Sequence, residues 1–331
     1  MKTMLSLTAC RICGNRHGNK PYRIKEMMFG LGREFIYFEC SNCGCLQISD
    51  IPEDISTYYP SDYYSFSRKS SKVTFDALKS PLSRLLKRER TRHAILGKGF
   101  FGKLVYKLFP DEIAKSISKI RLNRNSKILD VGCGSGNLLY CLKEIGFKKL
   151  FGIDKFIKSD ITYANGLRIQ KGSLQDLHGE WNLIMFNHSL EHISNQHETM
   201  QQVSKLLAQN GVCLVNTPTV SSYAWKTYKT NWVQLDPPRH YFLHSVRSLG
   251  LLAEKAELEV YYVLYNSTPF QFWGSEQYIR NIPLRSNKSC AEGPFASLSS
   301  IFKFKRYTQM SIQLNFINQG DQAAFYIMRK Q

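Results

Sequence analysis

The sequence contains no apolar run that approaches the roughly 20 residues needed to cross a bilayer. Its first ten residues also lack the apolar stretch of about 7–15 residues that a secretory leader carries before its cleavage site. Both absences argue against a membrane-spanning or exported protein, and we expect the chain to be cytoplasmic. With 43% hydrophobic and 21% charged residues in a length of 331, the chain can bury a core and is not intrinsically disordered.

Acidic residues are also scarce, because 26 Asp and Glu stand against 45 Lys and Arg, a formal net charge of +19. Most of the excess lies between Arg68 and Lys127, where 17 basic residues accompany four acidic ones. Such a segment attracts polyanions, whether nucleic acid, an anionic membrane surface or a diphosphate-bearing substrate. It is equally consistent with the solvated surface of helices. The pattern predicts a partly helical segment, with breaks at 80–81 and 97–102 and a helix start at Pro110–Glu112.

Four of the nine cysteines form two Cys-x-x-Cys pairs, namely Cys10, Cys13, Cys40 and Cys43. Two such pairs supply the four thiolates of a tetrahedral Zn²⁺ site, and a glycine follows each pair where the turn favours positive φ. In a reducing compartment the pattern indicates zinc rather than a disulfide, although a redox pair stays open. Residues 33–39 alternate as a strand would. We predict a small ribbon over residues 1–50 with a structural zinc, because four thiolates leave no open coordination position.

Aromatic residues crowd beside Pro, Ser and Asp over residues 58–66, a mixture that is not typical of a regular strand or helix. This loop would either lie over a pocket, with phenol groups such as that of Tyr64 as candidate catalytic hydrogen-bonding groups, or pack against the ribbon. We therefore assign residues 51–124 to a basic, partly helical linker or cap.

A glycine-rich turn follows a short apolar strand at residues 127–131. The turn contains Gly132, Gly134 and Gly136 and leads into a helical stretch. Glycines between a strand and a helix let the backbone approach a ligand closely and present amides at the helix N-terminus. A second strand ends at Asp154, where a carboxylate can accept hydrogen bonds from both hydroxyls of a ribose. This order of elements predicts a site for a ribose-containing cofactor.

The run Ile-Leu-Asp-Val-Gly-Cys-Gly-Ser-Gly resembles the first motif of class I S-adenosylmethionine (SAM) dependent methyltransferases, and Gly-Ile-Asp resembles the second. Residues 169–177, 181–187 and 211–218 are similar to the family's third, fourth and fifth strands, with Leu-Glu-His after the fourth. The resemblance implies an α/β fold with a doubly wound, Rossmann-like sheet of seven strands, the last of them antiparallel. It covers residues 125–265 as the SAM-binding core, and we expect residues 266–331 to form a C-terminal cap and the closing strand.

The resemblance also implies which residues hold SAM across the carboxyl ends of the strands. In chain order, the expected contacts are Asp130, Gly132, Gly134, Gly136, Asp154, Ser173, Leu174 and Asn187. The first four would cradle the methionine end, Asp154 the ribose, the next two the adenine, and Asn187 the sulfonium side. Ser173 stands where the family commonly has an acid that meets the adenine amino group.

The acceptor residues are expected after the fifth strand, where a Pro-Arg-His segment resembles one common in small-molecule and sugar methyltransferases. Methyl transfer requires an aligned acceptor and a group that removes a proton. His240 is a candidate base for a hydroxyl, amine or activated carbon; alternatively, Arg239 and His240 only fix the loop. His188 is a further catalytic candidate. With Glu191 and His192 it forms a second constellation, which would be either a polar pocket floor or a divalent-metal site.

A Cys-x-x-Cys ribbon before such a core resembles bacterial sugar methyltransferases that act on nucleotide-linked deoxysugars. This implies a small-molecule acceptor, with or without a diphosphate, in surface-polysaccharide or secondary-metabolite biosynthesis. The alternative is an RNA acceptor held by the ribbon and the basic segment, but no Asn-Pro-Pro-Tyr or Asp-Pro-Pro-Tyr follows the fourth strand. A third hypothesis is a catalytically inactive binding module, which the intact glycine loop and Asp154 disfavour.

Overall fold

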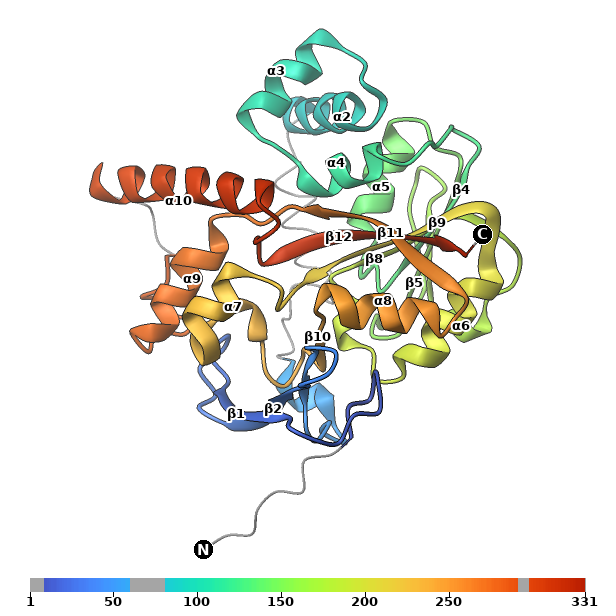
Figure 1. Ribbon diagram of the computed structural model, residues 1–331. Coiled ribbons are helices and arrows are strands. Elements are labelled where there is room, and N and C mark those ends of the chain that lie inside the picture. The colour runs from blue at the N-terminus through green and yellow to red at the C-terminus, as the bar shows by residue number, and fades with distance from the viewer. Residues whose placement is uncertain (1–8, 60–80, 291–297, 331) are drawn as a thin grey trace, which may run out of the picture.

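The computed structural model describes residues 9–59, 81–290 and 298–330, which form two sheets. The strands of the larger sheet are β4 (Lys127–Val131), β5 (Lys149–Asp154), β6 (Ile161–Thr162), β7 (Arg168–Lys171), β8 (Trp181–Asn187), β9 (Leu207–Pro218), β11 (Leu258–Tyr265) and β12 (Gln322–Arg329). Their order across the sheet is β11-β12-β9-β8-β4-β5-β7-β6. The sheet occupies the middle of the molecule (Figure 1).

The predicted seven-stranded, doubly wound sheet is confirmed, with one addition. Strands β7, β5, β4, β8 and β9 run parallel, and β12 is antiparallel to both of its neighbours, β9 and β11. The late strand therefore lies between two others rather than at the edge. The two-residue strand β6 pairs antiparallel with β7 and brings the total to eight. The sequence gives no sign of β6, because a two-residue strand is too short to show alternation.

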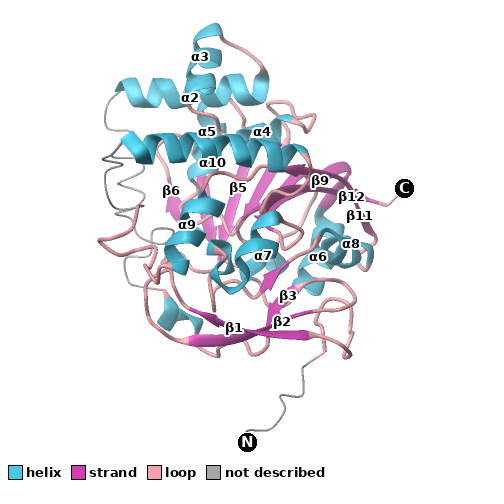
Figure 2. Cartoon of the chain, turned by 60° about the vertical axis from the view of Figure 1, so that its left-hand side comes forward, coloured by secondary structure: helices cyan, strands magenta, loops and turns pink. Residues whose placement is uncertain are grey.

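Helices cover both faces of this sheet (Figures 1 and 2). One side carries α4 (Glu112–Ser118) and α5 (Asn137–Glu144), and the other carries α6 (Gln196–Leu206) and α8 (Val246–Glu254). The alternation of β12 shows why two layers are needed. Ala324 and Tyr326 join the apolar cluster under α4 and α5, whereas the intervening Phe325 joins the cluster under α6 and α8. Because successive side chains point to opposite faces, a strand that is apolar throughout must be covered on both sides.

The second sheet is the N-terminal ribbon, but it is completed by the core. Its strands are β1 (Lys20–Lys25), β2 (Glu34–Glu39), β3 (Leu46–Ile48) and β10 (Phe242–Leu243), in that order and all antiparallel. The last of these comes from the part of the chain that also supplies the larger sheet, and it begins two residues after His240. Tyr37 and Phe38 of β2 belong to the same buried cluster as Trp225 of the core. The ribbon is therefore packed into the core and is not a separate module.

The described part of the basic segment, from Pro81 onward, forms a helical hairpin that leads into α4. Helix α2 spans Pro81–Leu96 and α3 spans Phe100–Leu108. The predicted start of the next helix is confirmed, because Asp111 caps α4 by accepting from the amide of Ala114 at 3.0 Å. The predicted break at 97–102 is too long: Gly102 lies inside α3. A Cβ there would overlap the carbonyl oxygen of Glu89 on α2, so glycine is present for close helix packing.

The remaining helices are α7 (Tyr223–Tyr228), α9 (Phe270–Ile279) and α10 (Leu298–Phe316), with 3-10 turns at Ile55–Tyr58, Leu174–Asp176, Leu190–His192, Lys229–Asn231 and Val233–Leu235. Helix α9 packs beside the ribbon end of the molecule (Figure 1). Within the described residues, no helix combines the length and the apolar character needed to span a bilayer.

Candidate active site

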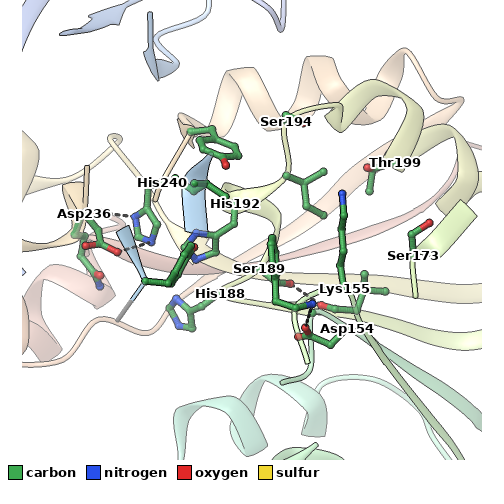
Figure 3. Close-up of a pocket in the computed structure, with 18 of the residues that line it drawn as sticks. Asp154, Lys155, Ser173, His188, Ser189, His192, Ser194, Thr199, Asp236 and His240 are labelled. Atoms are coloured by element: carbon green, nitrogen blue, oxygen red, sulfur yellow. Dashed lines mark hydrogen bonds and ion pairs between the residues drawn. The ribbon is translucent and has the colours of Figure 1, made fainter. Parts of the chain in front are cut away.

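A cavity of about 730 Å³ opens at the carboxyl ends of β4, β5 and β8, between the sheet and the ribbon. This is where open α/β sheets bind ligands. Its lining falls into two groups (Figure 3). Asp154, Lys155 and Ser173 lie at one end, and His188, His192, His240 and Asp236 lie at the other. Asp154 and Ser173 are among the cofactor residues predicted from the sequence, whereas Lys155 is not. His188, His192 and His240 come from the predicted acceptor constellations.

The glycine loop is tied to the end of β5 through Asp154. One oxygen of this carboxylate accepts from the amide of Gly134 at 2.8 Å, and the other accepts from the amide of Phe156 at 2.8 Å. Gly132 lines the cavity at φ +72°, and a Cβ there would lie 2.5 Å from the Cβ of Ser189. The loop can therefore be this close to Ser189 only with glycine, which leaves its backbone open to a ligand.

Ser173 and Leu174 line the same end of the cavity. The amide of Ser173 donates to Asp176 at 3.0 Å, and its hydroxyl lies 3.1 Å from the side-chain oxygen of Gln175. These contacts hold the short 3-10 turn that points Leu174, only 3% exposed, toward the cavity floor. The arrangement provides an apolar surface beside polar atoms, as a purine ring requires.

Two predicted cofactor residues lie behind the loop and do not line the cavity. Asn187 donates to Asp130 at 3.3 Å and accepts from Asn216 at 2.7 Å. Burial raises the pKa of Asp130 to about 7, with the nearby Asp154 acting in the same direction against the Asn187 hydrogen bond. Gly134 and Gly136 are likewise buried and absent from the lining. Asp130 and Asn187 therefore support the loop from behind, Gly134 and Gly136 form its buried part, and direct contact of these four residues with a cofactor stays a prediction.

At the acceptor end, Glu191 is fully buried beneath three histidines. One of its oxygens lies 3.6 Å from Nδ1 of His188, and the other accepts from Thr217 at 3.1 Å. Burial alone would raise the pKa of Glu191. The contact with His188 and the fields of His240 and His192 outweigh burial and lower it to about 2. A buried negative charge therefore faces the imidazoles. His188 has a left-handed backbone at φ +53°, a strained conformation often kept at functional sites.

His240 is held as a neutral imidazole. Its Nδ1 lies 2.7 Å from the carbonyl of Gln234, so Nδ1 carries the hydrogen and Nε2 keeps the lone pair. Burial and the adjacent His192 lower the pKa of His240 to about 4, against the opposing fields of Asp236 and Glu191. The Nε2 atom, 4.0 Å from Asp236, can therefore accept a proton at neutral pH.

The structure groups Glu191, His192 and His240 more closely than the predicted set that contained His188. Their ligand atoms all lie within 4.8 Å of one another. His192 also donates through Nδ1, to the carbonyl of Arg239 at 2.8 Å, which leaves its Nε2 with the lone pair. Two imidazoles and a carboxylate are a donor set that a divalent transition-metal ion accepts, so these three residues could hold a cation.

Arg239 connects the histidine loop to the ribbon. Its guanidinium is fully buried and pairs with Asp236 at 2.5 Å and with Glu26 of the ribbon at 2.6 Å. It also donates to the carbonyl of Tyr58 at 2.9 Å. Arg239 therefore ties the loop to the ribbon. Sequence reasoning missed both acids: Asp236 stands three residues before the arginine and was a detectable signal, whereas nothing marked Glu26.

The four predicted zinc ligands lie together at the ribbon's end. Cys10 and Cys43 have sulfur atoms 3.6 Å apart, and those of Cys13 and Cys40 are 3.5 Å apart. Tetrahedral coordination at the usual Zn–S length of about 2.3 Å separates sulfurs by roughly 3.8 Å, so the four thiols fit a zinc ion. The predicted glycine turns have φ values of +80° and +71°. Tyr37 links this ribbon to the site by donating to the carbonyl of His240 at 2.8 Å.

The ribbon, the linker and the segment that begins with α9 also contribute to the lining. Their residues at the cavity are Met28, Ile55, Tyr59, Phe270, Tyr278, Leu284 and Arg285. Tyr64, a predicted catalytic residue, lies outside the described residues. Tyr59, from the same aromatic segment, does line the cavity, which agrees with the hypothesis that this segment covers a pocket.

Comparison with known proteins gives one family match. Residues 105–263, nearly half of the chain, match a family model described as a methyltransferase domain. No curated protein matches. Similar solved structures include the cyclopropane synthase MmaA2 from Mycobacterium tuberculosis, with a TM-score of 0.42, 13% identity, and coverage of 65% of this chain and 82% of that one. A putative S-adenosylmethionine dependent methyltransferase from Listeria monocytogenes has a TM-score of 0.41 and 13% identity, with coverage of 66% and 97%.

Proposed function

Residues 105–263 match the model of a methyltransferase domain, and from that premise we propose that the protein is a class I SAM-dependent methyltransferase whose acceptor is a small molecule, a nucleotide-linked sugar of surface-polysaccharide or secondary-metabolite biosynthesis. The observation that carries this proposal is the cavity of about 730 Å³. It joins a cofactor end to an acceptor end, and the ribbon and α9 cover it. A cavity of this size, lined by the ribbon and α9 as well as by the sheet, suits a small metabolite better than a polymer.

The cofactor end fits SAM on the features of the chain itself. Gly132 leaves a place where any side chain would clash, and Asp154 presents a buried carboxylate at the cavity wall. We assign the ribose to Asp154, the adenine to Ser173 and Leu174, and the methionine end to the glycine loop. When bound, SAM supplies an electrophilic methyl carbon on a sulfonium.

The acceptor end would position a nucleophile and take its proton. His240 is neutral and keeps the lone pair on Nε2, so it can receive the proton of an acceptor hydroxyl or amine as the new bond forms. The buried charge of Glu191 would stabilise the imidazolium that results. Arg285, which lines this end, suits the negative charge of a diphosphate. His188 lies close enough to contact the same acceptor.

The arrangement of the basic segment supports a metabolite over RNA. The α2–α3 hairpin lies at the end of the molecule opposite the ribbon (Figure 1), so the two cannot together grip an RNA at the cavity. The four-thiol site suits zinc in a reducing compartment, and we place the protein in the cytoplasm on that ground.

Transfer of labelled methyl from SAM into a fractionated extract, with and without ribonuclease, tests the proposal. Label in a small ribonuclease-resistant fraction is the expected result. Label in precipitable, ribonuclease-sensitive material would overturn it in favour of an RNA acceptor. Failure to bind SAM in a calorimeter would favour a catalytically inactive binding module.

A further inference from the structure

The α2–α3 hairpin exposes an unusual amount of apolar surface. Seven of the eighteen large apolar side chains that are exposed in the described part of the chain lie between Leu82 and Phe109. The hairpin projects from the body of the molecule, away from the ribbon (Figures 1 and 2). None of its residues lines the cavity. Folded proteins rarely gather so many exposed apolar side chains on one projection unless another surface covers them.

Helix α3 turns its apolar stripe outward. The stripe consists of four large side chains that are between 47% and 89% exposed, namely Phe100, Phe101, Leu104 and Leu108. On a helix of 3.6 residues per turn these positions share an arc of about 100°. The face of α3 that is buried consists of Gly102 and Val105. A surface helix of a globular protein normally does the reverse and buries its apolar stripe.

Close packing on α2 holds α3 in this orientation. A Cβ at Gly102 would overlap the carbonyl oxygen of Glu89 and lie 2.9 Å from the Cβ of His93. Only glycine lets the two helices approach this closely, so rotating α3 to bury its stripe would push a large side chain into the backbone of α2. The outward stripe is therefore built into the hairpin.

The charge around the stripe is almost entirely positive. Residues 81–110 contain eight Lys and Arg and a single acid. Lys98, Lys103 and Lys107 are exposed, and the last two border the stripe on its helix. An apolar stripe flanked by lysines is the pattern of helices that lie in the headgroup region of an anionic bilayer.

We propose that the α2–α3 hairpin docks the protein on an anionic membrane surface. The apolar stripe enters the interface, and the lysines contact lipid phosphates. Two other occupants fit the same face less well. A second copy of this chain would set its own positive charge against that of the first, and RNA would neutralise the lysines but leave the phenylalanines uncovered. Docking through this face leaves the cavity and the ribbon on the side away from the lipid.

Co-sedimentation with vesicles tests the proposal. The full chain should bind mixed phosphatidylglycerol–phosphatidylcholine vesicles, bind pure phosphatidylcholine vesicles more weakly, and lose affinity as salt is raised. Replacing Phe100 and Phe101 by serine should weaken binding by about tenfold or more for each side chain. Replacing Lys98, Lys103 and Lys107 by glutamine should weaken it by about fivefold for each lysine.

The matched control is Leu31→Ser, which removes a 48% exposed apolar side chain at the ribbon end and should leave vesicle binding unchanged. SAM affinity equal to that of the unaltered chain shows that each variant is folded. The proposal is overturned if the unaltered chain does not bind anionic vesicles. It is overturned as well if the variant with serine at Phe100 and Phe101 binds these vesicles as tightly as the unaltered chain. It is also overturned if the stripe proves to mediate self-association or RNA binding without any vesicle binding.

Discussion

At the residue scale, the two carboxylate oxygens of Asp154 serve both the structure of the glycine loop and the wall of the cavity. Its carboxylate holds the amides of the glycine loop and of Phe156, and it also forms part of the cavity wall. A carboxylate oxygen has more than one lone pair, so it can keep these bonds and still accept from a ribose hydroxyl. The loop and the proposed ribose site therefore depend on the same side chain.

Asp154→Ala should weaken SAM binding by tenfold or more, because a hydrogen bond to a charged group contributes about 1.5–3 kcal/mol. Isothermal titration calorimetry measures the effect directly. Asp160→Ala, which removes an exposed acid after the same strand, is the control and should bind SAM normally. Equal SAM affinities in the two variants would show that Asp154 does not contact the cofactor.

His240→Gln should lower kcat by about a hundredfold or more, the usual contribution of a general base, with little change in SAM affinity. Since the pKa of His240 is lowered to about 4, the imidazole is already neutral above that value. The activity should therefore show no ionisation of this base between pH 5 and 8 and should fall only as the imidazole becomes protonated near pH 4. An inflection near pH 6.5 that the variant abolishes would contradict this. His178→Gln, at an exposed site, controls for the substitution itself.

At the element scale, the segment from Asp236 to Tyr241, just before β10, is held in place by a buried charge cluster. Arg239 sits between Asp236 and Glu26, with all three side chains almost wholly out of solvent. Asp236 itself has a left-handed backbone at φ +39°. The cluster explains how a short irregular segment keeps a histidine in one orientation.

Arg239→Met should destabilise the chain by about 3–5 kcal/mol, because it leaves two buried carboxylates without their cationic partner. Urea unfolding followed by tryptophan fluorescence measures this. Arg23→Met in the same ribbon is the matched control: Arg23 pairs with Glu34 at 3.5 Å, but both side chains are more than half exposed, so its loss should cost less than about 1 kcal/mol. Similar costs for the two variants would mean that the buried cluster does not hold the loop.

The sequence predicted those features well that depend only on residues close together along the chain. The glycine turn after β4, the acid that ends β5 and the paired cysteines each need only neighbouring residues, and all lie where expected. The ribbon's completion was not predictable in this way. Strand β10 has two residues and therefore no alternation, and its pairing partner, β3, lies far away along the chain. Glu26 could not be predicted either, because its partner, Arg239, also lies far away along the chain.

At the scale of the whole molecule, the ribbon and the core share one apolar cluster. Cys10, Tyr37 and Phe38 of the ribbon belong to the same buried cluster as Trp225 and Leu249 of the core. The buried cluster thus runs across residue 50, where the predicted ribbon segment ends. A shared core makes unfolding of the ribbon and the core a single event.

Removing zinc with a chelator should therefore lower the midpoint of one unfolding transition for the whole chain, as seen by differential scanning calorimetry. Cys43→Ser should reproduce the shift, and Cys290→Ser, at an exposed cysteine outside the cluster, should not. A separate low-temperature transition for the ribbon, with the main transition unmoved, would show that the two parts unfold independently.

Because β10 pairs with β3 of the ribbon, it limits which parts of this protein could be exchanged with a relative. An engineer who wished to change the acceptor by grafting a relative's first fifty residues would leave β10 beside a foreign partner strand and Arg239 without Glu26. The graft would have to include the segment from Asp236 to Ser245 as well, because Ser245 donates to the carbonyl of Cys43 at 2.5 Å. The exchangeable part of this enzyme is thus discontinuous in sequence, and recombination at a single crossover point would break it.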